Sequence, residues 1–249
     1  LAGLCLDPTN GYLFVTYSAP DESGLLRNHI RRFDTDTQRF ATTPTAVTEI
    51  ARAVSIVQSA PSHQIGGCVV ADDSLYVGIG DGGEPRASQR LDDPRGKVLR
   101  VTFDGESYAE NPFFGVGGSV APMVWAFGLR NPFGLTHVNG QVFVADNGPS
   151  LDRFLQLRRG QNYRWDGTND SMGLQTDVAF AETIGPVHVA YVDGKTSPFF
   201  QGDSGGFYVA MSASGRGNVG LKAIPYAISD RPDWGTPYDF VKYTGPIST

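Results

Sequence analysis

Short apolar segments separated by turn residues recur along the whole chain. Four of them are rich in β-branched and aromatic residues and are bounded by Gly, Asp, Asn or Ser, which is typical of β-strands. They span residues 11–17, 74–79, 141–145 and 206–210. Polar turns at residues 6–11, 70–74 and 136–140 lead into three of them. Each of these three turns therefore predicts a hairpin.

The four segments are almost evenly spaced. If Leu13, Leu75, Val142 and Phe207 occupy equivalent positions, they lie 62, 67 and 65 residues apart. A near-constant period indicates a repeated supersecondary unit. Further strands, such as those at 29–33 and 97–103, give about four strands per unit, the content of a propeller blade. The prediction is an all-β fold, with a β-propeller favoured over a β-sandwich whose hairpins are evenly spaced by accident.

The 249 residues hold about four such units. No linker or shift in composition divides them, so we predict a single partial β-propeller domain over residues 1–249, truncated at both ends. The 31 glycines and 16 prolines fit frequent turns and exclude a coiled coil or a helical bundle.

Charge and hydropathy remove other classes. The net charge is −6 and basic residues form no cluster, so we expect no nucleic-acid partner. No apolar run approaches the roughly 18 residues that a membrane span needs, so no membrane span is expected. Cys5 and Cys68 are too few for a disulfide framework, and we interpret them as two small core residues in strands.

Two local motifs suggest chemistry that their surroundings contradict. Residues 202–206 read Gly-Asp-Ser-Gly-Gly, as around the nucleophile of trypsin-like proteases. No histidine has the Ala-Ala-His-Cys context of those enzymes, and His188 lies only 16 residues before Ser204, so a turn is preferred. Residues 78–83 match G-x-G-x-x-G, but Pro85 follows and no helical apolar stripe does, which argues against a dinucleotide site.

Candidate functional side chains occur in four segments between strands. His63 precedes two glycines, and Asp81 in a glycine-rich turn could orient its imidazole. Arg130 and Asn131 end an apolar run before a proline and could hold an anionic or carbonyl-bearing ligand. Taken singly, each also fits a surface or turn residue.

The fourth segment is residues 146–152, Asp-Asn-Gly-Pro-Ser-Leu-Asp. Its backbone carbonyls, carboxylates and amide oxygens suit a hard cation such as Ca²⁺. A plain turn explains it equally well.

Taken together, the motifs resemble the glucose/sorbosone dehydrogenase family, which includes soluble quinoprotein glucose dehydrogenases and aldose sugar dehydrogenases. The resemblance runs from residue 1 to about 166. It is carried by His63-Gln64-x-Gly66-Gly67, Gly80-Asp81-Gly82-Gly83, Gly96-Lys97-Val98-Leu99-Arg100, Asn111-Pro112-Phe113, Trp125-Ala126-x-Gly128-x-Arg130-Asn131-Pro132, Asn147-Gly148-Pro149 and Gly160-x-Asn162-Tyr163-x-Trp165.

The resemblance implies a six-bladed propeller with pyrroloquinoline quinone (PQQ) and Ca²⁺ at the mouth of its channel. His63 would be the general base that takes the proton of the sugar's C1 hydroxyl. Asp81 would orient His63, and Arg130 would stabilise charge on the quinone oxygen. The remaining positions would hold the cofactors: Asn131, Asn147 and Asp152 near PQQ, and the carbonyls of Gly148 and Pro149 on Ca²⁺.

The expected activity is PQQ-dependent oxidation of an aldose to its lactone, with an external electron acceptor as partner. The alternative is a non-catalytic propeller that binds a protein or glycan partner. The resemblance also implies a periplasmic or secreted location.

Overall fold

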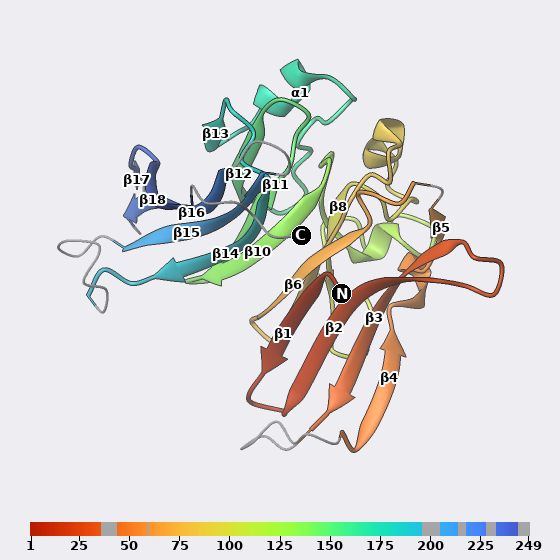
Figure 1. The fold of residues 1–249 in the computed structure, drawn as a ribbon. Coiled ribbons are helices and arrows are strands. Elements are labelled where there is room, and N and C mark those ends of the chain that lie inside the picture. Colours follow the sequence, from red (N-terminus) through yellow and green to blue (C-terminus); the bar gives the residue numbers. More distant parts are fainter. Residues whose placement is uncertain (36–43, 59, 196–204, 214–217, 228–232, 244–249) are drawn as a thin grey trace.

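The computed structural model describes residues 1–35, 44–58, 60–195, 205–213, 218–227 and 233–243. The fold is all-β, and its strands form four antiparallel sheets that follow one another along the chain (Figure 1). We name them A to D in chain order. In each sheet the first four strands are neighbours in sequence order, with β5 added beside β3 and with β18 added beside β16.

The first two sheets follow one another from residue 3 to residue 127. Sheet A consists of β1 (Gly3–Asp7), β2 (Tyr12–Pro20), β3 (Leu26–Asp34), β4 (Ala46–Ile50) and β5 (Val57–Gln58). Sheet B consists of β6 (Ile65–Ala71), β7 (Ser74–Ile79), β8 (Lys97–Val101) and β9 (Val124–Phe127).

The other two sheets repeat the pattern. Sheet C consists of β10 (Pro132–Val138), β11 (Gln141–Asp146), β12 (Asp152–Leu157) and β13 (Val178–Phe180). Sheet D consists of β14 (Pro186–Val192), β15 (Gly205–Ala213), β16 (Asn218–Ala227), β17 (Asp233–Trp234) and β18 (Tyr238–Tyr243). Helix is confined to α1 (Asn169–Gly173) and three 3-10 turns, Arg52–Val54, Pro85–Gln89 and Ala121–Met123, in the described residues.

The predicted repeat is confirmed. The four equivalent positions fall in β2, β7, β11 and β15, the second strand of each sheet, and the predicted turns join β1 to β2, β6 to β7 and β10 to β11. Four consecutive antiparallel meanders arranged in this way have the strand order of propeller blades.

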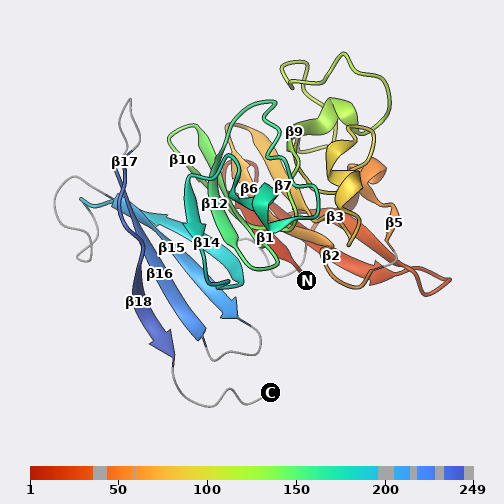
Figure 2. The same ribbon diagram turned by 90° about the horizontal axis from the view of Figure 1, so that it is seen from above.

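The first strands of the four sheets, β1, β6, β10 and β14, lie next to one another (Figures 1 and 2). Their backbones approach closely because Gly66 and Gly67 are the second and third residues of β6. A Cβ on Gly67 would lie 2.6 Å from the carbonyl oxygen of Phe133 in β10, and one on Gly66 would lie 2.5 Å from that of Pro132. The glycine pair after His63 is therefore required by packing between sheets B and C.

Three apolar clusters fill the spaces between successive sheets. Phe14 and Ile30 of sheet A pack with Leu75 and Leu99 of sheet B. The cluster between sheets B and C includes Tyr76, Val98, Val144 and Leu155. The cluster between sheets C and D includes Phe143, Phe154, Phe207 and Ile224. Since sheet B is covered on both faces, all six residues of β7 are buried, which explains its nearly continuous apolar run.

The two cysteines lie in strands, as predicted, but the interpretation of them as separate core residues is wrong. Cys5 in β1 and Cys68 in β6 form a disulfide, with Cα atoms 5.9 Å apart, that joins sheet A to sheet B. The pairing could not be predicted from the sequence, because it depends on the contact between β1 and β6, the first strands of two sheets, whose cysteines are 63 residues apart.

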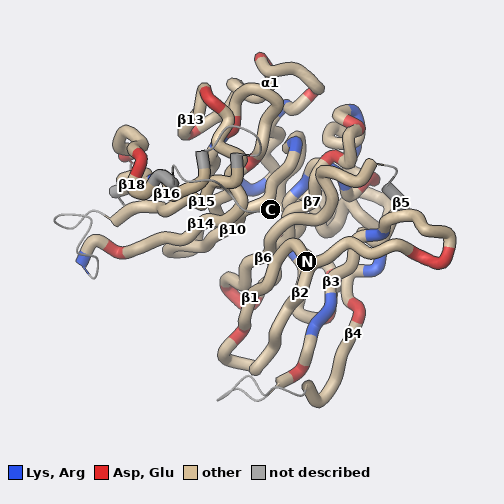
Figure 3. Tube along the Cα trace, in the orientation of Figure 1, with Lys and Arg blue, Asp and Glu red and all other residues tan. Residues whose placement is uncertain are grey.

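The two contradicted motifs have other structures. After residues 78–83 comes the 3-10 helix Pro85–Gln89 rather than an α-helix, which agrees with rejecting a dinucleotide site. Ser204 lies outside the described residues, and the two glycines after it begin β15. Acidic and basic residues are interspersed over the described part of the chain (Figure 3). None of its helices is long and apolar enough to span a membrane.

Candidate functional site

The predicted site residues gather at one end of the sheets. His63 and Arg130–Asn131 lie just before the first strands of sheets B and C, β6 and β10. Asp81 follows β7, and residues 147–151 join β11 to β12. Because neighbouring strands are antiparallel, the start of a first strand and the end of the second strand share one edge of the sheet. The connectivity thus brings residues from distant parts of the sequence together.

His63 and Asp81 form a hydrogen-bonded pair. Nδ1 of His63 lies 2.7 Å from Oδ1 of Asp81, and the His63 side chain remains 19% exposed while that of Asp81 is 2% exposed. His63 has a left-handed backbone, with φ of 55°, and its carbonyl accepts from the N–H of Gly82. With Nδ1 directed at the carboxylate, Nε2 is the nitrogen left to exchange a proton with a ligand.

The carboxylate of Asp81 is held from several sides. Oδ1 also accepts from the N–H of Gly83 at 2.9 Å, and Oδ2 accepts from the indole Nε1 of Trp165 at 2.7 Å. Burial acts to raise the pKa of Asp81, but the hydrogen bonds from His63, Gly83 and Trp165 outweigh it and the pKa is lowered. Asp81 therefore stays ionised next to the imidazole.

Arg130 and Asn131 are fixed through their backbone. Their N–H groups donate to Oδ1 of Asp146, at 3.2 and 2.7 Å. The guanidinium of Arg130 donates to the carbonyl of Asn147 at 2.8 Å and lies 5.7 Å from the ring centre of Trp165. Both side chains are partly exposed, so they can still meet a ligand.

A buried ion pair lies beneath these residues. Oδ2 of Asp146 accepts from Nε and Nη2 of Arg153 at 3.0 and 2.9 Å, and both side chains are fully buried. Arg153 also donates to the carbonyls of Tyr163 and Gly128. Asp146 thus supports the site from beneath, and both of its carboxylate oxygens accept hydrogen bonds from Arg130, Asn131 or Arg153.

Asp152 braces the loop between β11 and β12. Its Oδ1 accepts from the N–H of Gly148 at 2.8 Å, and its Oδ2 accepts from the N–H groups of Ile184 and Gly185 at 2.6 and 2.9 Å. Burial raises the pKa of Asp152, the three N–H groups act to lower it, and the charge of Asp146 raises it further. The structure thus places Asp152 under the loop, against backbone.

Asn147 links sheets C and D, because its amide donates to the carbonyl of Pro186 at 2.8 Å. Gly148 and Pro149 follow it at the tip of the loop. A side chain at Gly148 would overlap the carbonyl of Leu151, so the tight turn needs glycine. The described residues contain no group of three or more His, Cys, Asp or Glu side chains that could hold a metal.

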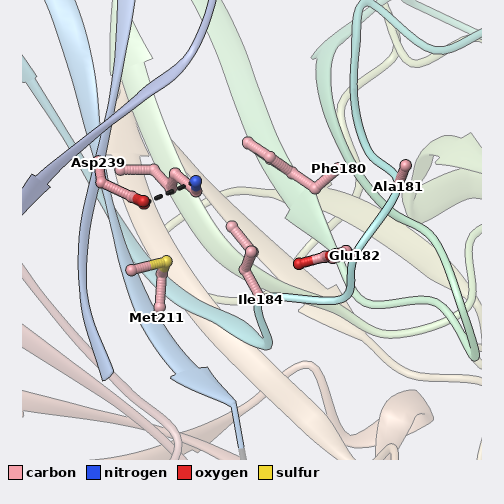
Figure 4. A pocket seen from close by; sticks show the side chains of 7 residues that line it. Phe180, Ala181, Glu182, Ile184, Met211 and Asp239 are labelled. Carbon is pink, nitrogen blue, oxygen red and sulfur yellow. Dashed lines mark ion pairs between the residues drawn. The ribbon is translucent and has the colours of Figure 1, made fainter. Parts of the chain in front are cut away.

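An open pocket lies beside His63. Its volume is about 420 Å³, and its lining includes His63, Gln64, Asn131 and Phe133. The buried Oε1 of Gln64 has no hydrogen-bond partner among the described residues. A second pocket of about 170 Å³ shares none of these residues (Figure 4). It lies between sheets C and D and contains Phe180, Glu182, Met211 and the ion pair of Lys222 and Asp239.

Sequence reasoning gave no role to Trp165 or Arg153, and it considered Asp146 only as part of a segment with oxygen donors for a cation. Trp165 stands out only as the end of the Asn162-Tyr163-x-Trp165 motif, and its target is 84 residues away. Asp146 had a weak signal, since it ends the otherwise apolar strand at residues 142–145. Arg153 is the charged residue inside a buried strand that would pair with it.

Comparison with known proteins gives the family. Residues 1–205 match the Glucose / Sorbosone dehydrogenase family. The chain is 28% identical over 149 residues to Aldose sugar dehydrogenase YliI of Escherichia coli (strain K12), covering 56% of this chain and 40% of the relative. It is 31% identical over 129 residues to Quinoprotein glucose dehydrogenase B of Acinetobacter calcoaceticus, covering 43% of this chain and 26% of the relative.

The fold is likewise shared with a solved structure. The PQQ-bound form of aldose sugar dehydrogenase from Streptomyces coelicolor superposes with a TM-score of 0.69 and 21% identity, over 96% of this chain and 66% of that one. The chain thus spans less than half of the two curated relatives and about two thirds of the solved one. The family match over most of its length shows that this chain belongs to the glucose/sorbosone dehydrogenase family.

Proposed function

We propose that this chain carries the proton-abstracting part of a PQQ-dependent sugar dehydrogenase that oxidises the C1 hydroxyl of an aldose to the lactone. The observation that carries the proposal is that His63, paired with the buried Asp81, lines an open pocket whose lining also includes Asn131. A histidine held by a buried carboxylate, with its second nitrogen free, is suited to general-base catalysis.

The residues of this chain divide the work. His63 accepts the hydroxyl proton at Nε2, and Asp81 stabilises the resulting imidazolium through Nδ1. Arg130 and Asn131 present a cation and an amide next to the pocket, where they would bind a carbonyl or carboxylate oxygen. When bound, PQQ supplies the two-electron acceptor for the hydride that leaves C1, and Ca²⁺ polarises it.

The pocket suits a cofactor that carries carbonyl or carboxylate oxygens. It offers the amide of Asn131, and the guanidinium of Arg130 lies on the neighbouring residue. A relative is named a quinoprotein and a protein of the same fold binds PQQ, which supports PQQ as the cofactor. The external acceptor that reoxidises the enzyme stays a prediction.

In the loop between β11 and β12, backbone carbonyl oxygens are better placed than carboxylates to bind Ca²⁺. Asp152 is engaged by three N–H groups. By contrast, no hydrogen bond within the described part of the chain ends on the carbonyl oxygen of Gly148 or Pro149. Ca²⁺ accepts backbone carbonyl ligands, so we assign these two oxygens to it, with Asn147 beside the cofactor.

We propose the six-bladed form of the propeller, with two further sheets beside the four described ones. Sheets A and D each expose apolar residues on the face that no other described sheet covers. Leu6 and Val47 of sheet A are 44% and 49% exposed, and Tyr238 and Val241 of sheet D are 41% and 49% exposed. Two further sheets would bury these faces in the way that sheets A and C bury sheet B.

We also propose a periplasmic or secreted location. The disulfide between Cys5 and Cys68 supports it, because disulfides form and persist in oxidising compartments. Counting free thiols in protein isolated under alkylating conditions tests this proposal. Two free thiols in the native protein would contradict it.

Dye reduction by aldoses, measured with PQQ and Ca²⁺ present and with each omitted, tests the activity. His63→Gln should lower kcat by about 100-fold or more, as expected for loss of a general base. His29→Gln is the matched control, because His29 pairs with Glu49 at 2.9 Å in sheet A, outside the site. It should leave kcat unchanged.

Binding separates this proposal from the alternative. A spectral titration with PQQ should give a saturable change in the wild type and in both variants. A folded protein that does not bind PQQ, or equal activity in His63→Gln and the wild type, would overturn the proposal and favour a non-catalytic partner-binding propeller.

A further inference from the structure

The segment that ends at Trp165 crosses from sheet C to sheet B. After β12, the chain runs beside the end of β9, where the N–H of Tyr163 donates to the carbonyl of Phe127 at 2.8 Å and that of Trp165 donates to Gly128 at 2.9 Å. The carbonyl of Trp165 accepts from the amide of Gln89 at 2.9 Å. Both backbone polar groups of Trp165 are therefore fixed, and the residue is 3% exposed.

The indole of Trp165 contacts two of the proposed site residues at once. Its Nε1 donates to Oδ2 of Asp81, while Oδ1 of the same carboxylate faces His63. The guanidinium of Arg130 lies 5.7 Å from its ring centre, within cation–π range. The Trp165 side chain thus connects the His63–Asp81 pair of sheet B to Arg130 before sheet C.

We propose that Trp165 is a positioning residue that locks the carboxylate of Asp81 in the rotation that serves His63 and supports Arg130 at the edge of the pocket. This proposal rests on the proposed function. A carboxylate turns easily about its last bond, because that torsion has a broad, shallow minimum. A buried donor on Oδ2 leaves Oδ1 directed at His63.

The hydrogen bond from Trp165 also affects the charge of Asp81. It is one of the interactions that lower the pKa of this carboxyl against the opposing effect of burial. The charge of His63, before β6, acts on Asp81, and the charge of Asp81 acts on Arg95, before β8. A substitution of Trp165 replaces neither His63 nor Arg95, so a rise in the pKa of Asp81 would report the loss of the indole N–H.

Trp165→Phe removes the N–H and keeps an aromatic ring beneath Arg130. The matched control is Trp125→Phe, because the buried Nε1 of Trp125 has no hydrogen-bond partner among the described residues. We expect Trp165→Phe to lower kcat about tenfold with little change in KM, and to move the acid limb of kcat/KM up by about 0.5–1 pH unit. Trp125→Phe should change neither. An unmoved acid limb would overturn the positioning role.

A second readout needs neither PQQ nor folding of the Trp165 variant. In ¹H–¹⁵N spectra of the chain, Asp81→Asn should shift the indole resonance of Trp165 and leave that of Trp125 in place. An unchanged Trp165 resonance would overturn the inference. If the wild type is inactive with PQQ while this shift is observed, the proposed function fails and the contact stands, so the two failures are distinguishable.

Discussion

Replacing Arg153 by methionine should destabilise the protein strongly. Methionine keeps much of the volume of the side chain but removes the charge that faces Asp146. Both side chains of this pair are fully buried, so the carboxylate that remains cannot recover its interactions from water. Removing one partner of a buried pair costs about 3–5 kcal/mol. The carbonyls of Tyr163 and Gly128 lose a charged donor as well.

Calorimetric or spectroscopic melting measures the effect. For a chain of this size, 1 kcal/mol corresponds to about 2–4 °C in Tm, so a fall of about 6–20 °C is expected. Arg158→Met is the control, because Arg158 pairs with Asp177 at 3.4 Å and its side chain is 54% exposed. An exposed pair contributes about 0–1 kcal/mol.

The double variant Asp146→Asn with Arg153→Met sharpens the test. Without the carboxylate, the loss of the guanidinium should cost less, so the two changes should not be additive. The reasoning is refuted if Arg153→Met lowers the free energy of unfolding no more than Arg158→Met does. It is also refuted if the double variant loses the sum of the free energies lost by Asp146→Asn and Arg153→Met.

Three further measurements follow from the titrating and bonded groups. Burial lowers the pKa of Lys97 from 10.5 to about 7. Between these pH values the unfolded chain binds one more proton than the folded chain, so the free energy of unfolding should rise with pH by up to about 1.4 kcal/mol per pH unit. Urea midpoints measured from pH 7 to 9 should show this rise in the wild type and not in Lys97→Met. The pKa of Asp81 is lowered below 3.8, so its contribution is present above pH 3.8 and is lost as pH falls through the folded-state value; acid unfolding should be less steep in Asp81→Asn, and an unchanged curve would contradict the assignment. Reducing the disulfide of Cys5 and Cys68, which closes a 63-residue separation, should cost about 4 kcal/mol; an unfolding midpoint unaffected by dithiothreitol would exclude a stabilising role.

The repeat could be predicted from the sequence because each unit contains a short apolar strand segment next to polar turn residues. The second strand of each sheet lies between two neighbouring strands and contains apolar core residues, such as Phe14 in β2 and Leu75 in β7, so each strand shows a similar apolar pattern in the sequence. Its flanking turns leave polar signals of their own. Strand pairs joined by short turns therefore needed no knowledge of distant residues.

The contacts between sheets could not be predicted in the same way. The bond between Cys5 and Cys68 and that between Trp165 and Asp81 join residues 63 and 84 positions apart. The first depends on the contact between the first strands of sheets A and B, and the second depends on a segment after β12 that returns to sheet B. Neither arrangement leaves a pattern in the local sequence.

The proposed site shows both situations. The residues themselves and the resemblance both suggested that Asp81 orients His63, and in the structure Nδ1 of His63 lies 2.7 Å from Oδ1 of Asp81. For Asp152 the resemblance implied a place near the cofactor, and the structure shows a carboxylate occupied by three backbone N–H groups. The roles of the site residues in catalysis stay predictions, since spacing along a chain does not say which way a carboxylate faces.

The disulfide between the first two sheets has a consequence for biosynthesis. Cys5 and Cys68 both precede sheets C and D in the chain. During synthesis or export from the amino terminus, this pair can be oxidised while most of the remaining strands have not yet emerged. Sheets A and B would then be joined as an early folded unit, against which the later sheets assemble in chain order.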